Sequence, residues 1–171
     1  MFEHKGIKSE LKFSQVTKEH LIKTIDYLFE KYNIGTINCA ILLSNNNRPS
    51  QLFSKIYLAP INGNLSDHQK IIYQFSHELS HSIQDYQQRG LPIKCKFVDG
   101  VLKQEDFPAH SIQETEAVAN SVDVIENVLK YEGYNARQRD YPEYYDYDEA
   151  FRLVDSGELN NLRKKYSNTV E

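Results

Sequence analysis

The segment from Asp67 to Gln88 has two faces of opposite character at helical spacing. Apolar side chains recur along it every three or four residues, the pattern of a helix that buries one side in a core. These side chains are Ile72, Phe75, Leu79 and Ile83. His77 and His81 lie almost opposite this stripe on a helical wheel. The chain must therefore fold with a core on one side of this helix and a polar site on the other.

The two histidines belong to the pentapeptide His77-Glu-Leu-Ser-His81, an HExxH pattern. Imidazoles four residues apart on a helix point the same way and can bind one zinc ion. Glu78 is turned by about 100° from His77, so it flanks the metal and does not bind it. From there it can take a proton from water and later pass it to a leaving amine. The pattern predicts a metal-dependent hydrolase with Glu78 as its base; the competing interpretation is a solvated His-Glu-His face.

A hydrolytic zinc site generally has three protein ligands and one open position. The longer pattern HExxHxxGxxH, which supplies a third histidine, is absent after His81. Glu116, 35 residues further on, is the predicted third ligand, in a helix expected from Ser111 to Tyr131. Asn120, one turn later, is expected to hydrogen-bond a ligating histidine and fix its tautomer.

Glu114 is the competing carboxylate on this helix. With Ser111 it forms the capping-box pattern Ser-x-x-Glu, which gives its side chain a separate use in closing the helix N-terminus. Glu116 is preferred as the ligand for that reason. His110, just before the helix, is a further candidate, either as a third imidazole ligand or as a hydrogen-bond donor to the transition state.

A tyrosine-rich and acidic segment follows, which is expected to become helical near its end. Between residues 131 and 151 it contains six of the chain's 12 tyrosines. Tyr134 and Tyr141 are candidate donors to the oxyanion of a hydrolytic reaction. The alternative is that these rings pack against the protein and keep their hydroxyl groups in water.

The remaining pattern predicts short strands and one earlier helix. The helix is expected over residues 18–32 and the strands over 34–44, 54–61 and 92–98. The first two strands are expected to form a hairpin or to be neighbours in a small antiparallel sheet. Lys55–Pro60 is the candidate edge strand for pairing with an extended substrate, and an internal strand fits the sequence equally well. On the HExxH helix, Gln74 and Asp85 fall near the histidine face, where they can line a cleft or support a ligand.

We therefore expect an α+β fold, in which a small antiparallel or mixed sheet packs on the HExxH helix and on a second, ligand-bearing helix. The 171 residues suit a single domain. Its catalytic core is expected over about residues 17–131, followed by the tyrosine-rich helical segment over 132–171.

Charge and hydropathy exclude some classes of partner. The net charge is −4 with acids and bases interspersed, so no cluster of Lys and Arg predicts nucleic-acid binding. The N-terminus lacks the apolar core of a signal peptide, and no stretch approaches the length of a membrane span. We expect a cytoplasmic protein; a secreted form would require a leader that has been removed. The oligomeric state is left open.

The motifs together resemble those of the gluzincins, in which HExxH is followed by Glu-x-x-Ala-Asp/Asn, here Glu116-Ala-Val-Ala-Asn120. The stretch IYLAPINGNLSDHQKIIYQFSHELSHSIQ is similar to the ImmA/IrrE-type metallopeptidases in particular, and the resemblance covers about residues 54–127. It implies a zincin-like fold, one zinc ion held by His77, His81 and Glu116, and cleavage of a regulatory protein. Ser80 stands where that family often has Gly.

The expected function is thus a zinc-dependent endopeptidase that acts on a protein or peptide. Other divalent ions also suit two histidines and a glutamate, so zinc is an expectation of chemistry and resemblance. Two alternatives are kept: a metal-binding regulatory module without turnover, and a structural helical protein with a fortuitous HExxH. The intact base Glu78 argues against the first alternative, and a carboxylate at a plausible spacing argues against the second.

Overall fold

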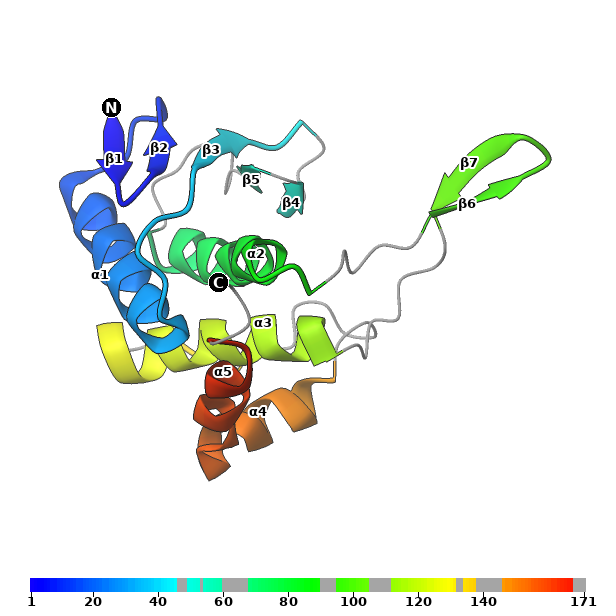
Figure 1. Cartoon of the computed structure of the whole chain (residues 1–171). Coiled ribbons are helices and arrows are strands. Elements are labelled where there is room, and N and C mark those ends of the chain that lie inside the picture. Colours follow the sequence, from blue (N-terminus) through cyan, green and yellow to red (C-terminus); the bar gives the residue numbers. More distant parts are fainter. Residues whose placement is uncertain are drawn as a thin grey trace.

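The computed structural model describes residues 1–45, 49–52, 54–59, 68–89, 95–104, 112–131, 134–137 and 146–167. Within these ranges the chain is α+β, with a five-stranded mixed sheet, a separate two-stranded hairpin and five α-helices. Helix α2 (His68–Tyr86) lies between the sheet on one side and helix α3 (Ile112–Asp123) on the other (Figure 1). None of the helices in these ranges is both long enough and apolar enough to cross a bilayer.

The five-stranded sheet has the order β1-β2-β3-β5-β4. Its strands are β1 (Phe2–His4), β2 (Ile7–Ser9), β3 (Cys39–Leu43), β4 (Ser50–Leu52) and β5 (Lys55–Leu58). Strands β2, β3 and β5 are parallel to one another, and the two edge strands are antiparallel to their neighbours. Alternate residues are buried in β5 and at the start of β3, so that Ile41, Ile56 and Leu58 face the core.

One expectation about this sheet was wrong, and the structure decides a choice that the sequence left open. The strands predicted over 34–44 and 54–61 are neighbours, but β3 and β5 run parallel and form no hairpin. The chain reverses twice between them, because the additional short strand β4 pairs antiparallel with β5 on its outer side. β4 therefore occupies the edge that had been predicted for Lys55–Pro60, and β5 lies inside the sheet; Pro60 is outside the described residues.

The helices follow their apolar patterns closely. Helix α1 (Gln15–Tyr32) begins three residues before the predicted start, because the Ser14 side chain accepts a hydrogen bond from the Thr17 backbone N–H. It ends at Asn33, which adopts a left-handed conformation. The stripe on α2 is confirmed: Ile72, Phe75, Leu79 and Ile83 are fully buried in the main core.

The helix predicted over residues 111–131 does not remain an α-helix to its expected end. After α3 the chain forms a π-helix, η1 (Val124–Leu129), which ends where Lys130 turns left-handed. Helices α4 (Tyr147–Ser156) and α5 (Glu158–Ser167) then pack against α3 around a second apolar cluster that includes Val118, Ala150 and Leu153.

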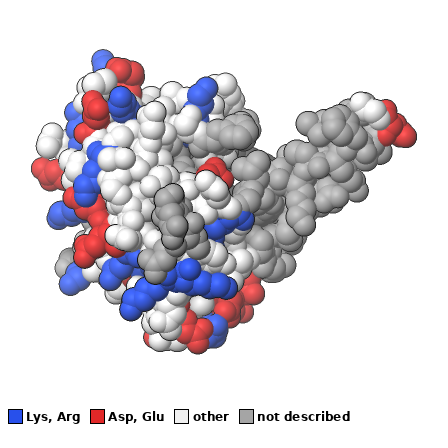
Figure 2. Space-filling view, viewed as in Figure 1, with Lys and Arg blue, Asp and Glu red and all other residues white. Residues whose placement is uncertain are grey.

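The remaining strands stand apart from the main sheet. β6 (Cys95–Val98) and β7 (Val101–Gln104) pair antiparallel around the predicted turn at Asp99-Gly100 and extend away from the helices (Figure 1). On the face shown in Figure 2, basic and acidic side chains border one another across the described surface.

A buried arginine fixes α5 to the rest of the protein. Arg163 is only 1% exposed, and its guanidinium donates to Asn120 Oδ1 at 2.8 Å and to Asp123 Oδ2 at 2.8 Å. The Tyr27 hydroxyl of α1 donates to the same Asp123 oxygen at 2.7 Å. Burial alone would raise the pKa of Asp123, but the positive charge of Arg163 outweighs it and holds this pKa below its usual range.

The same network reaches the HExxH helix. Asn120 Nδ2 donates to Ser80 Oγ at 2.9 Å, and Ser80 Oγ donates to the Ser76 carbonyl at 2.7 Å. Ser80 thus has a polar partner on each side. Through Asn120 and Ser80, α5 sets the distance between α2 and α3.

Replacement of Arg163 by Met should lower the free energy of unfolding by about 3–5 kcal/mol, because Asp123 is left buried without its cation. Urea denaturation followed by circular dichroism measures this change. Arg152→Met is the matched control, since Arg152 lies on the exposed face of α4, and should alter stability little. An unfolding free energy of Arg163→Met equal to that of the control would show that the network does not stabilise the fold.

Candidate metal centre

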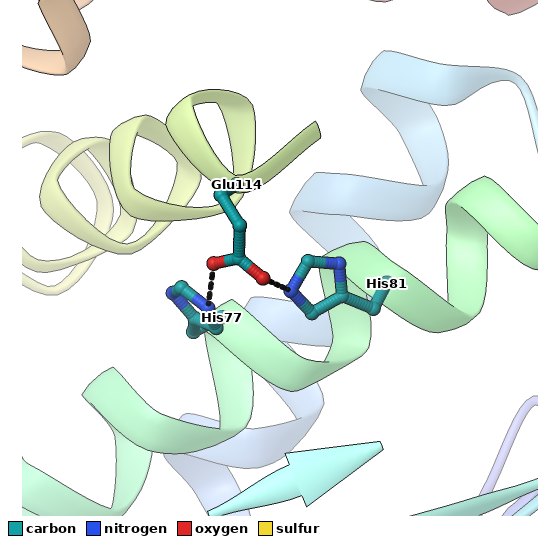
Figure 3. A group of neighbouring side chains, drawn as sticks. All are labelled: His77, His81 and Glu114. Carbon is teal, nitrogen blue, oxygen red and sulfur yellow. Dashed lines mark hydrogen bonds and ion pairs between the residues drawn. The ribbon is translucent and has the colours of Figure 1, made fainter. Parts of the chain in front are cut away.

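Three buried side chains from two helices converge at one point. Helix α2 supplies His77 and His81, one turn apart, and the first turn of α3 supplies Glu114. His77 Nε2 lies 3.0 Å from Glu114 Oε2, and His81 Nε2 lies 2.8 Å from Glu114 Oε1 (Figure 3). The three residues are 5–8% exposed. Each carboxylate oxygen therefore faces one imidazole.

This triad can hold a metal ion. Each residue offers one ligand atom, and the three atoms all lie within 4.8 Å of one another. Ligand bonds to zinc are roughly 2.0–2.2 Å long for nitrogen and oxygen, so donors at this spacing can share one ion. The set of two imidazole nitrogens and one carboxylate is also chemically suited to a divalent transition metal. The residues present therefore fit the group that the HExxH pattern implies.

The protonation of the metal-free triad reflects the same arrangement. Burial alone would lower the pKa of His81, but the hydrogen bond and charge of Glu114 outweigh burial and raise it to about 9. Burial likewise works against ionisation of Glu114, yet the charge of His77 and the hydrogen bonds from both histidines hold its pKa well below the usual range. A proton on His81 thus balances the carboxylate, and a metal ion would displace it from Nε2.

Glu78 lies beside the triad without joining it. Its side chain is 7% exposed, and within the described part of the chain it has no hydrogen-bond partner. Burial raises its pKa, against the opposing charges of His77 and His81. A buried carboxylate with a raised pKa binds a proton more readily than an exposed one, which suits a general base.

The structure does not bring the predicted third ligand, Glu116, to the histidines; Glu114 lies there instead. Glu116 is fully buried, but Arg89 donates to both of its carboxylate oxygens, at 2.7 and 2.9 Å. The hydroxyl of Tyr32 donates to it as well, at 2.7 Å. With these bonds Glu116 neutralises a buried arginine and is not part of the group around the histidines.

Helix geometry explains why only one of the two glutamates reaches the histidines. Residues two apart on a helix are turned by about 200° from each other, so Glu114 and Glu116 face nearly opposite directions. The capping-box argument assigned Glu114 to the helix end, but its oxygens contact His77 and His81 across the helix interface. Ser111, the other member of that pattern, lies outside the described residues.

Asn120 also has a role different from the predicted one. Its amide bonds to Tyr32, Ser80 and Arg163 and to neither ligating histidine. Gln84 is the residue that contacts His81 at the ring nitrogen that does not face Glu114. Its Oε1 lies 2.8 Å from His81 Nδ1. Helical spacing could have indicated this contact from the sequence, since Gln84 lies three residues after His81 on the same helix.

The remaining predicted site residues are His110, Tyr134 and Tyr141. His110 and Tyr141 lie outside the described residues. The ring of Tyr134 contacts that of Tyr131, with centroids 6.4 Å apart, at the edge of the main core. This contact gives no support to Tyr134 as a donor near Glu78.

Gln74 and Asp85 hold the sheet to α2 on either side of the motif. The Ala59 backbone N–H, just after β5, donates to Gln74 Oε1 at 2.9 Å. The Gln51 side chain of β4 donates to Asp85 Oδ2 at 2.7 Å.

No family model, no curated protein and no solved structure matches this chain.

The two glutamates should respond differently to substitution. Glu114→Ala should abolish stoichiometric zinc binding, because it removes one of three ligands, while the protein remains folded. Glu116→Ala should leave the triad intact but lower the unfolding free energy by about 3–5 kcal/mol, because Arg89 is left buried without its anion. Zinc content by mass spectrometry and thermal melting measure the two effects. Loss of zinc in Glu116→Ala, with zinc retained in Glu114→Ala, would contradict the corrected assignment.

Proposed function

We propose that this chain is a zinc-dependent endopeptidase of the zincin type, which hydrolyses peptide bonds in a protein or peptide substrate. One observation carries the proposal: His77, His81 and Glu114 converge from two helices, with the buried carboxylate of Glu78 beside them. Two imidazoles and one carboxylate with a nearby base is the ligand set of hydrolytic zinc sites. The resemblance to ImmA/IrrE-type peptidases supports it through the HExxH helix and the sheet above that helix, with Glu114 in place of Glu116.

The residues divide the chemistry between them. His77, His81 and Glu114 would hold the zinc ion, which when bound supplies Lewis acidity that polarises the scissile carbonyl. Glu78 takes one proton from the attacking water as the oxygen of that water bonds to the carbonyl carbon. The same carboxyl group then delivers this proton to the amide nitrogen as the carbon–nitrogen bond breaks. The burial of Glu78 favours this cycle, since it raises the pKa of the carboxyl group.

The sheet offers a surface for an extended substrate. β4 is an edge strand, so no described strand pairs with the outer side of its backbone. A peptide can add to such an edge as a further strand, with main-chain hydrogen bonds that do not depend on its sequence. The Gln51–Asp85 hydrogen bond connects this strand to α2 one turn beyond His81. We therefore expect a substrate segment in extended conformation along β4.

The alternative function is a metal-binding regulatory module without turnover. It uses the same three ligands but gives no use to Glu78. Burial of the Glu78 carboxylate is a cost to the fold, although the charges of His77 and His81 offset part of it. Its retention beside the triad favours catalysis.

Glu78→Gln tests the proposal most simply, because it keeps the shape of the side chain and removes the base. We expect this variant to bind zinc as the wild type does and to lose about 100- to 10,000-fold in turnover. The assay is mass-spectrometric detection of cleavage in a mixed protein library, alongside the zinc content of each variant. His77→Ala is the control that should lose both zinc and cleavage. Unchanged cleavage by Glu78→Gln, or none by zinc-loaded wild type, would count against the peptidase.

A further inference from the structure

Gln84 connects the two helices of the metal centre through a single side chain. It is fully buried on α2, one turn after His81. Its Oε1 lies 2.8 Å from His81 Nδ1, and its Nε2 donates to the backbone carbonyl of Gln113 at 3.0 Å. Gln113 immediately precedes the ligand Glu114 in the first turn of α3. One amide thus contacts one ligand directly and the chain neighbour of another.

The partners of this amide determine its orientation. A backbone carbonyl only accepts hydrogen bonds, so the NH₂ end of Gln84 must face Gln113. The oxygen end must then face His81, and an amide oxygen only accepts. His81 Nδ1 is therefore the donor and carries a proton. When the imidazole is neutral, its lone pair is on Nε2, the nitrogen that faces Glu114.

This orientation is the one that metal binding requires. A histidine that binds a metal through Nε2 generally donates its Nδ1–H to a fixed acceptor, which sets the tautomer and the ring angle. In this chain the acceptor is an amide oxygen that is itself held by the backbone of the other ligand-bearing helix. Movement of α3 relative to α2 would turn the amide and the His81 ring together.

We propose that Gln84 is the positioning residue of the metal centre: it holds His81 in the tautomer and orientation that bind the metal, and it ties that orientation to the α3 turn carrying Glu114. The inference rests on the proposed metal site. It concerns the affinity and geometry of that site and does not depend on the substrate.

Gln113 provides a matched control. Its Nε2 donates to the backbone carbonyl of Arg89 at 3.1 Å, which is a bond from α3 back to the end of α2. Each glutamine therefore makes a side chain to backbone hydrogen bond between α3 and either α2 or the turn after it, and Gln84 is the one whose amide lies against His81. Gln113→Met removes one interhelical bond without touching His81.

The experiment compares Gln84→Met, Gln84→Glu and Gln113→Met with wild type. The readouts are the zinc dissociation constant, from competition with a chromophoric chelator, and the visible spectrum of the Co²⁺-loaded protein. Gln84→Met should weaken zinc binding by about 10- to 100-fold and change the Co²⁺ spectrum. Gln84→Glu keeps an acceptor for His81 Nδ1 but loses the hydrogen bond to the Gln113 carbonyl, so its zinc affinity should fall by less than tenfold. Gln113→Met should bind zinc with wild-type affinity.

The outcomes distinguish failure of the role proposed for Gln84 from failure of the proposed metal site. Equal losses of affinity in Gln84→Met and Gln113→Met would show that Gln84 only docks the helices, and would overturn the inference. So would a tenfold loss in Gln84→Glu, which keeps the acceptor, and this arm is informative even where Gln84→Met does not fold. Wild-type affinity in Gln84→Met, with zinc lost in Glu114→Ala, overturns the inference and leaves the site standing. Absence of zinc binding by wild type overturns both.

Discussion

The contact between Glu114 and the two histidines of α2 determines how the centre of this protein is built. It places a carboxylate between two imidazoles, 3.0 and 2.8 Å away, in a region with little access to water. Charged groups are costly to bury unless they are paired, so this contact requires α2 and α3 to meet at one register. Around it the two helices exchange further polar bonds, through Gln84 and through Asn120 with Ser80.

The interface between α2 and α3 separates two carboxylates that are close in sequence. Glu114 faces the histidines, while Glu116 faces Arg89 and Tyr32 on the opposite side of the helix. The ring of Tyr166, near the end of α5, stacks on the Arg89 guanidinium with 3.5 Å between the guanidinium carbon and the ring centroid. The first carboxylate is thus available for a ligand, and the second is fully used in holding the fold. Helix α3 therefore has one face toward the histidines and another face that holds the fold together.

Features that follow from a periodic pattern within one segment could be predicted from the sequence. The apolar stripe of α2 and the opposing histidines follow from helical periodicity, and the structure confirms the stripe as core. The choice between Glu114 and Glu116 could not be made in this way, because it depends on Arg89 and Tyr32, which lie elsewhere in the chain. The direction of β5 depended similarly on β4, a three-residue strand too short to show a pattern. Asn120 was expected behind a histidine, but the buried Arg163 of α5 holds its amide oxygen.

X-ray diffraction at the zinc absorption edge, from crystals of the zinc-loaded protein, tests the central claim most directly. An anomalous difference map locates the ion without reference to any proposed mechanism. We expect one peak per chain within bonding distance of His77 Nε2, His81 Nε2 and a carboxylate oxygen of Glu114, with Glu116 still bound to Arg89. A map with no peak at the histidines, or with the ion on Glu116, would contradict the account.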